Sequence, residues 1–170
     1  MKVLLTAIVS SIAAMLIQPV VLLLWFVLPA VLSGADMAWL DLGPISFYSV
    51  LFAAPFVLLV GVPLSLILWR IGRFRWWPLA ASGALAGALF VGWDIPGGDP
   101  GYSSGGNWYG QPVQFVVAGV PTLYGWLSYM QSILAFALHG FVGATTFYVV
   151  WASVLRPNNS FKPNPLRGSA

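Results

Sequence analysis

Charged side chains are scarce in this sequence. Only 6% of its 170 residues are charged, 59% are hydrophobic, and the mean hydropathy is +0.88. A soluble domain carries roughly 25% charged residues because its surface faces water. So few charges cannot cover a water-facing surface, and we expect hydrocarbon to be the main solvent. The seven basic residues are too scattered to form a nucleic-acid groove, so nucleic acid is not an expected partner.

Cysteine is absent altogether. This excludes disulfides, thiolate zinc sites, cysteine-ligated iron–sulfur clusters and cysteine nucleophiles. The sequence also lacks a nucleotide-binding motif, a metal-ligand cluster and a plausible Ser-His-Asp set, because its single histidine lies far from every acid. We therefore expect no enzymatic activity and no cofactor.

Long apolar runs are abundant. They predict an all-α integral membrane domain over residues 1–156, because a backbone in lipid must satisfy its own hydrogen bonds. A secretory signal peptide is the alternative for the first run, but apolar sequence continues well past any cleavage site and favours a retained anchor. That run is about 45 Å long as a helix, so we expect tilt or a kink near Pro19, with Pro29 in its last turns. The four expected spans are about 3–32, 45–71, 76–93 and 124–155.

Acidic and basic residues occupy different connections between the expected spans. All four acids fall between spans one and two or between spans three and four, and every cation falls on the opposite side. Positive residues favour the cytoplasmic side, so both termini are expected in the cytoplasm. The cations are Lys2, Arg70, Arg73, Arg75, Arg156, Lys162 and Arg167; the acids are Asp36, Asp41, Asp94 and Asp99.

A basic and aromatic cluster joins the second and third spans. Arginines there can reach lipid phosphates while tryptophans lie at headgroup level, so we expect lipid anchoring rather than a regulatory partner. The cluster comprises Arg70, Arg73, Arg75, Trp76 and Trp77.

Small residues in the third span predict close helix packing. Gly83 and Gly87 are four apart, beside Ser82 and Ala86, and such spacing lets a neighbouring backbone approach. We favour a partner helix in the same chain over a dimer, although a homo-oligomer stays open. Prolines in the second span, at 55 and 63, resemble the broken helices of transporters. Without a matching broken helix we favour an ordinary kinked span.

His139 lies near the middle of the fourth span, on a stripe of small and polar residues. The first span carries a similar stripe, Ser11, Ala14 and Gln18, at a compatible depth, so we predict a hydrogen bond between Gln18 and His139. A proton or polar-substrate relay is one hypothesis, because histidine titrates near a pH of about 6.5. A structural hydrogen bond is favoured, since no carboxylate lies within the spans. The stripe is Ser128, Ser132, Ala135, His139, Gly143 and Thr146.

The connection between spans three and four is long and rich in Gly and Pro. We expect turns in its first half, and an interfacial, re-entrant or strand-like piece over residues 113–120. Two acids five apart are a weak calcium signal. A loop this long is uncommon without a purpose, so it is our first candidate for recognition outside the cytoplasm. The candidate residues are Asp94, Asp99, Trp108 and Tyr109.

Residues 157–170 are expected to form a disordered cytoplasmic tail. Its end, NNSFKPNPLRGSA, resembles the translated edge of the recombination site that follows bacterial integron gene cassettes, with Asn164 where Thr is usual. The resemblance implies a bacterial cassette gene and an association with stress, defence or surface adaptation. The helical spans of such a bacterial protein lead us to expect an inner-membrane location.

Two hypotheses for function follow. The first is a non-enzymatic interaction or protective protein acting through its outer loop, and the second is a small oligomeric transporter or channel subunit using the polar stripe around His139. Membrane lipids are the expected partners, and the sequence names no ligand.

Overall fold

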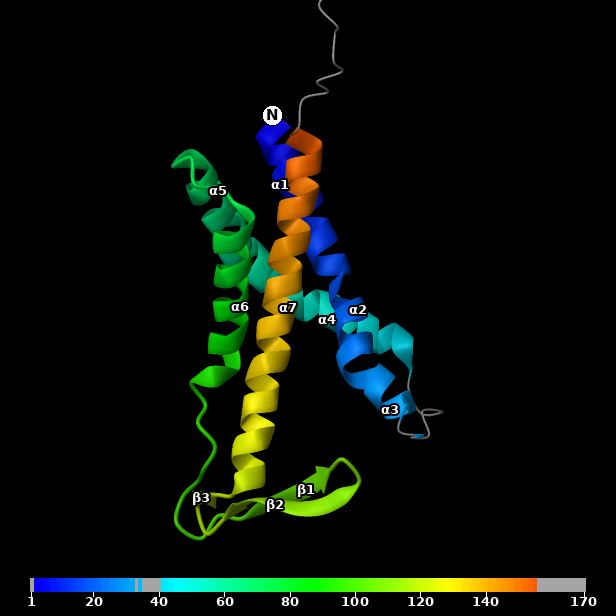
Figure 1. The fold of residues 1–170 in the computed structure, drawn as a ribbon, viewed down its shortest axis with the longest axis vertical. Helices are drawn as coiled ribbons and strands as arrows, with labels where there is room; N and C mark the ends of the chain where they lie inside the picture. The colour runs from blue at the N-terminus through cyan, green and yellow to red at the C-terminus, as the bar shows by residue number, and fades with distance from the viewer. Residues whose placement is uncertain (1, 33, 35–40, 156–170) are drawn as a thin grey trace, which may run out of the picture.

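The computed structural model describes residues 2–32, 34 and 41–155. Within them, long helices form a bundle with a small sheet at one end (Figure 1). Asp36, Arg156 and the tail that carries the cassette resemblance lie outside the described residues.

The first helical span, residues 2–32, is interrupted rather than uniform. It breaks at Ile17, two residues before Pro19, whose missing N–H removes one hydrogen bond of the helix. The irregularity expected near Pro19 is therefore present. The span consists of α1 (Lys2–Leu16), α2 (Gln18–Leu22), the π-helical turn η1 (Leu23–Val27) and α3 (Leu28–Leu32).

The second helical span, residues 42–70, begins at a capped end. Asp41 has an extended backbone, and its side chain accepts a hydrogen bond from the Gly43 N–H at 3.0 Å. This satisfies one of the free donors at a helix start. The span consists of α4 (Leu42–Phe56), the π-helical turn η2 (Val57–Gly61) and α5 (Val62–Arg70).

The two π-helical turns have a common cause. Each ends two residues before a proline: η1 before Pro29 and η2 before Pro63. A proline ring clashes with the carbonyl four residues earlier, and widening the preceding turn relieves that clash. The broken helix of the second span therefore has a counterpart in the first span, contrary to the expectation from the sequence.

The remaining helices are α6 (Trp76–Gly92) and α7 (Leu123–Leu155). In the described part of the chain, three helices are long and apolar enough to cross a membrane: Lys2–Val27, Leu42–Arg70 and Leu123–Leu155. The α6 helix is equally apolar but has 17 residues, which corresponds to about 25 Å.

The glycines of α6 pack within the chain. A Cβ atom on Gly83 would collide with the Gly140 carbonyl, and one on Gly87 would collide with the Phe136 carbonyl. The backbones of α6 and α7 are therefore in direct contact, as small residues four apart permit. Tyr129 strengthens the pair by donating its hydroxyl to the carbonyl of Gly92.

The connection between α6 and α7 folds into an antiparallel sheet. Its strands are β1 (Ser104–Trp108), β2 (Gln111–Val117) and β3 (Val120–Pro121), in the order β1-β2-β3. Tyr109 and Gly110 form the first turn with φ angles of 48° and 86°, as a two-residue hairpin requires. The all-α prediction is therefore wrong here, and the piece at 113–120 is a strand and turn.

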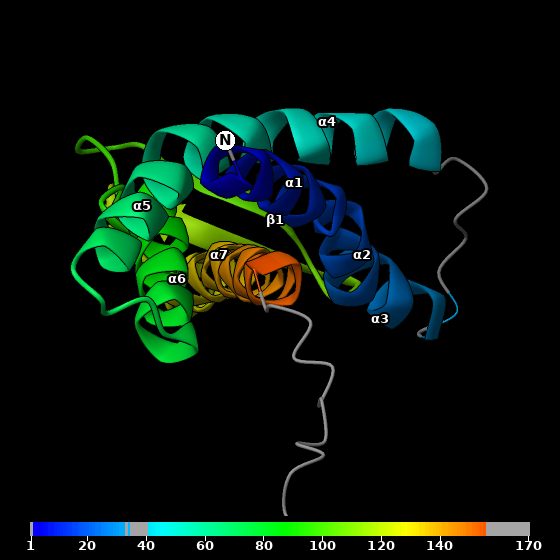
Figure 2. The ribbon, with the colours of Figure 1, turned by 90° about the horizontal axis from the view of Figure 1, so that it is seen from above.

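Basic and acidic residues lie at opposite ends of the described structure. The start of α1, the end of α7 and the α5–α6 connection lie at one end of the molecule, and the sheet lies at the other (Figure 1). Lys2 and the three arginines at 70, 73 and 75 thus lie opposite the acids at 94 and 99. Viewed from above, α1 lies between α4 and α7 (Figure 2). The buried core is formed by Ala7, Ala14, Leu79, Phe147 and Trp151.

Candidate functional site

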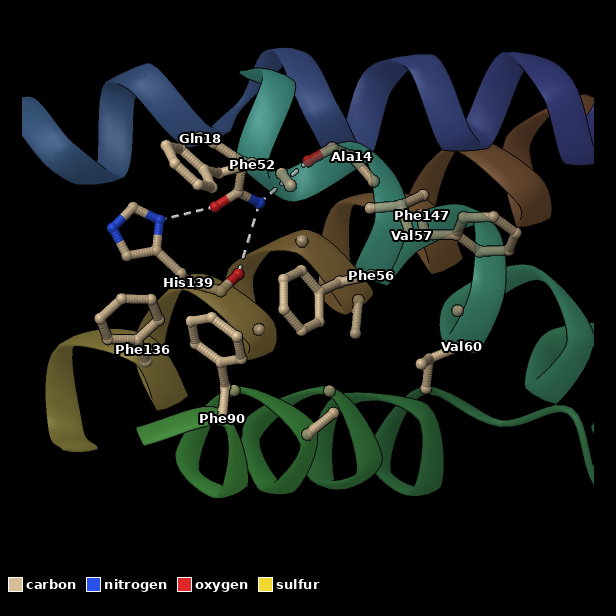
Figure 3. Close-up of a pocket in the computed structure, with 18 of the residues that line it drawn as sticks. Ala14, Gln18, Phe52, Phe56, Val57, Val60, Phe90, Phe136, His139 and Phe147 are labelled. Atoms are coloured by element: carbon tan, nitrogen blue, oxygen red, sulfur yellow. Dashed lines mark hydrogen bonds between the residues drawn. The ribbon is translucent and has the colours of Figure 1, made fainter. Parts of the chain in front are cut away.

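The polar stripes of the first span and α7 meet at Gln18 and His139. His139 Nδ1 lies 2.7 Å from Gln18 Oε1, so the hydrogen bond predicted from their depths is present. Gln18 Nε2 donates to the carbonyl of Ala14 at 2.9 Å and approaches the carbonyl of His139 at 3.4 Å (Figure 3). Gln18 is 4% exposed, and both hydrogen-bonding atoms of its side-chain amide have partners inside the bundle.

These contacts fix the orientation of the Gln18 amide. Backbone carbonyls only accept hydrogen bonds, so the amide nitrogen must face Ala14 and the amide oxygen must face His139. An amide oxygen also only accepts, and His139 Nδ1 must therefore carry the proton that it donates. In a neutral histidine this leaves Nε2 unprotonated, as a hydrogen-bond acceptor.

A glycine makes room for this pair. Gly143 lies one turn beyond His139 on α7, and a Cβ atom there would stand 2.8 Å from Gln18 Nε2. That distance is shorter than real Cβ contacts allow, so a larger residue would displace the Gln18 amide. The small residues of the stripe thus serve to admit one buried polar side chain.

A cavity of about 410 Å³ lies beside the pair, between all four helical segments. Its size falls in the range of small-molecule pockets, roughly 300–1,000 Å³. Glycines, alanines and six phenylalanines make up much of its wall, and Figure 3 shows phenyl rings beside it from α4, α6 and α7. Four of the six rings remain exposed in the isolated chain, so the cavity is not fully enclosed. Phe90 lies 4.8 Å from Phe56 and 5.4 Å from Phe136 between ring centroids. The phenylalanines of the wall are Phe26, Phe52, Phe56, Phe90, Phe136 and Phe147.

The hydroxyl groups on the cavity wall are already satisfied. Ser49, Ser65 and Ser82 each donate to a carbonyl of their own helix, at 2.8, 2.6 and 2.7 Å. Because Gln18 is satisfied too, the wall offers a guest apolar surface and few hydrogen-bond donors. No charged side chain lines the cavity among the residues that the structure describes.

A second hollow, of about 340 Å³, lies under the β1–β2 hairpin. It is more polar than the cavity, and it contains the hydrogen bond from Gln131 Nε2 to the Tyr109 hydroxyl at 2.9 Å. Phe26 and Ala135 line both the hollow and the cavity, so the two spaces adjoin there. Its other lining residues are Asn107, Trp108, Tyr109, Phe115, Ser128, Gln131 and Ser132.

The polar stripe of α7 follows these two spaces. Ser128 and Ser132 line the hollow, Ala135 lines both, and His139 and Gly143 line the cavity. Thr146, the last member of the predicted stripe, lines neither.

The four candidate residues of the outer connection do not form one site. Trp108 ends β1 and Tyr109 lies in the β1–β2 turn, whereas the Asp99 backbone lies against Gly119 in the β2–β3 turn. The seven residues of β2 separate these turns, which is about 20 Å of strand. Asp94 and Asp99 are exposed, and no group of three metal-ligating side chains is present in the described part of the chain.

The predicted lipid anchors are exposed at the far end from the sheet. Arg70, Arg73, Arg75 and Trp77 point outward, as an interfacial cluster requires. Trp76 also contacts α7, because its Nε1–H donates a hydrogen bond to Thr145 Oγ1 at 3.2 Å.

The aromatic wall was not found from the sequence. Phe52 and Phe56, four residues apart, lie on one helix face. That spacing was the available signal. It is ambiguous, because Phe47 and Phe141 are exposed as well and do not line the cavity.

No protein-family model, curated protein or solved structure matches this chain. The function must therefore be inferred from the site itself.

Proposed function

We propose that the chain is a four-span inner-membrane protein with both termini in the cytoplasm. Trp76 and Trp77 at one end of α6 and Trp93 at its other end are suited to the two headgroup regions. They extend an apolar helix of about 25 Å toward the roughly 30 Å hydrocarbon thickness. The separation of cations and acids at opposite ends supports the orientation.

We propose further that the protein binds a neutral, lipophilic small molecule within the bilayer. The observation that carries this proposal is the cavity of about 410 Å³, walled by phenyl rings and bordered by one polar pair. A charged ligand would find no counter-ion on the described wall, and burying an unpaired charge is costly. Such binding is the first step expected of a small transporter or channel subunit.

The two π-helical turns support a binding role. Phe26 of η1 and the Val57, Val60 and Gly61 positions of η2 all line the cavity. Wide turns inside α-helices are frequent at functional sites because they redirect side chains.

A proton relay would need a second titratable group beside His139. Neither the cavity nor the hollow is lined by a carboxylate among the described residues, and proton pathways in membranes normally pair a histidine with such groups.

The test is binding of 1-methoxynaphthalene, a neutral lipophilic probe, to the protein in lipid nanodiscs, with empty nanodiscs as the partition blank. Ala53→Trp and Ala86→Phe fill the cavity, and each should weaken binding at least tenfold. Leu85→Phe, on an exposed face of α6, is the matched control and should bind like the wild type. Equal binding by all four proteins would refute the proposal, and would be the result if a lipid acyl chain held the cavity.

Recognition through the outer sheet is a second proposal. Its supporting observation is Tyr109, which stands 75% exposed at the tip of the hairpin. In a strain whose phenotype depends on this gene, replacing residues 104–111 by a Gly-Ser linker should abolish complementation while Ala53→Trp preserves it. The opposite pattern would leave the cavity as the functional site.

A further inference from the structure

The unprotonated nitrogen of His139 is unused by the Gln18 pair. Gln18 binds Nδ1, and no hydrogen bond to Nε2 occurs within the described residues. In Figure 3 the Nε2 side of the ring faces away from Gln18, toward the sheet end of α7. A base of this kind, at membrane depth and beside a cavity, is a ready acceptor for a hydrogen-bond donor.

The space on that side can hold a polar group. One turn from His139 toward the sheet lies Ala135, which borders both the cavity and the hollow, as does Phe26. Beyond it the hollow presents amide and hydroxyl groups from Asn107, Gln131 and Ser128. A molecule whose apolar body lies among the phenyl rings would thus meet polar partners only at this junction.

We infer that the ligand is a neutral amphiphile with one hydroxyl or N–H donor, which binds His139 Nε2 while its apolar body fills the phenylalanine-walled cavity. This inference rests on the proposed binding function and specifies its ligand class. Gln18 acts as a positioning residue, because it holds the proton on Nδ1 and so keeps Nε2 free to accept. The hollow under the hairpin accommodates any further polar part of the molecule.

The inference predicts a preference between two matched probes. 1-Naphthol and 1-methoxynaphthalene share an aromatic body and differ in one O–H donor. With wild-type protein in nanodiscs, 1-naphthol should bind about tenfold more tightly after correction for partition, as one hydrogen bond to a buried acceptor allows. His139→Phe should erase the preference, so that this variant binds the two probes equally.

Equal binding of the two probes by the wild type would overturn the inference and leave the proposed function intact. Failure of both probes to bind, with cavity-filling variants unchanged, would instead defeat the proposed function. A preference that persists in His139→Phe would also overturn the inference, because another group would then accept the hydrogen bond.

A second measurement needs no variant. The chain has one histidine, so ¹⁵N-labelled histidine gives one pair of ring nitrogen signals. Nδ1 should appear protonated and Nε2 unprotonated in the free protein, and 1-naphthol should shift the Nε2 signal upfield while 1-methoxynaphthalene leaves it in place. A protonated Nε2 in the free neutral histidine, or equal shifts with both probes, would overturn the inference.

Discussion

At the scale of single residues, the Gln18–His139 pair shows how a bundle of apolar helices can bury polar groups. Each hydrogen-bonding atom of the Gln18 amide has a partner, so its burial carries no unsatisfied donor or acceptor. The small residues around it, Ala14 and Gly143, admit the amide without displacing a backbone. Such a pair fixes the depth at which α7 and the first span meet.

A double-mutant cycle should measure the coupling between these two side chains. Gln18→Met and His139→Phe each remove one partner and keep a side chain of similar bulk. In detergent unfolding experiments, the double variant should be more stable than the sum of the single effects predicts, by about 0.5–2 kcal/mol. Simple additivity would show that the hydrogen bond contributes nothing to the packing of the two helices.

The sequence permitted the prediction of this pair for a physical reason. An ionisable residue at membrane depth must face the bundle interior, so His139 needed a polar neighbour, and counting residues from one membrane face left Gln18 at a matching depth. No comparable rule selects Phe26 or Phe90. Phenylalanine is equally stable against lipid and inside a bundle. Only the three-dimensional arrangement therefore distinguishes the rings that line the cavity from the other phenylalanines.

At the scale of helices, α6 and α7 form the tightest contact of the bundle. Gly83 and Gly87 were predicted to allow a close approach, and their partners on α7 are the backbones at Gly140 and Phe136. Gly140 was not singled out beforehand, because it lies beside the polar stripe rather than on it.

Gly87→Ala should therefore weaken the α6–α7 contact. The new methyl group would meet the Phe136 carbonyl, which is backbone and cannot move without shifting the helix. We expect a loss of about 1–3 kcal/mol in thermal or denaturant unfolding followed by circular dichroism. Gly61→Ala is the control, since its nearest atom would be the Phe56 carbonyl at 3.8 Å. Equal stability of the two variants, with a change of oligomeric state in Gly87→Ala, would argue for a contact between chains instead.

The sheet was missed because its strands lack the usual signals. β1 contains Gly105 and Gly106, which are poor strand formers. Its turns use Tyr-Gly and Ala-Gly, with Tyr109 and Ala118 at positive φ, in place of the familiar Asn-Gly. The sheet is held by tertiary contacts, including Phe115 against Gly125 of α7.

A glycine pair tests how firmly this segment is folded. Gly119 and Gly101 have similar φ angles of 86° and 91°, so alanine strains both backbones alike. Only at Gly119 would the new Cβ also meet backbone, at 2.8 Å from the carbonyls of Gly98 and Asp99. Gly119→Ala should thus raise the rate of limited proteolysis within residues 94–121 several-fold above that of Gly101→Ala. Equal rates for the two variants would mean that the strand connection is not packed as described.

At the scale of the whole molecule, apolar length predicted the helical segments well. The expected spans at 3–32, 45–71, 76–93 and 124–155 coincide with helices to within a few residues, because only a helix satisfies a long apolar backbone internally. The bundle arrangement was less accessible. Lipid provides no hydrophobic driving force between helices. The hydrophobic periodicity of the sequence therefore did not predict that the second span crosses the first and leaves a cavity beside α6.

The orientation proposed for the protein in the membrane can be tested with single cysteines, because the chain has no cysteine of its own. Single cysteines at Asn107 in β1 and at Gly72 between α5 and α6 lie at opposite ends of the molecule, and both positions are exposed. If the arginine-rich end faces the cytoplasm, a membrane-impermeant maleimide should label Asn107→Cys in intact spheroplasts. It should label Gly72→Cys only after the membrane is permeabilised. Labelling of Gly72→Cys alone in intact spheroplasts would invert the topology. Labelling of both would mean that the residues from α6 to the sheet do not cross the bilayer, which would leave 17-residue α6 as a helix packed on three spanning ones.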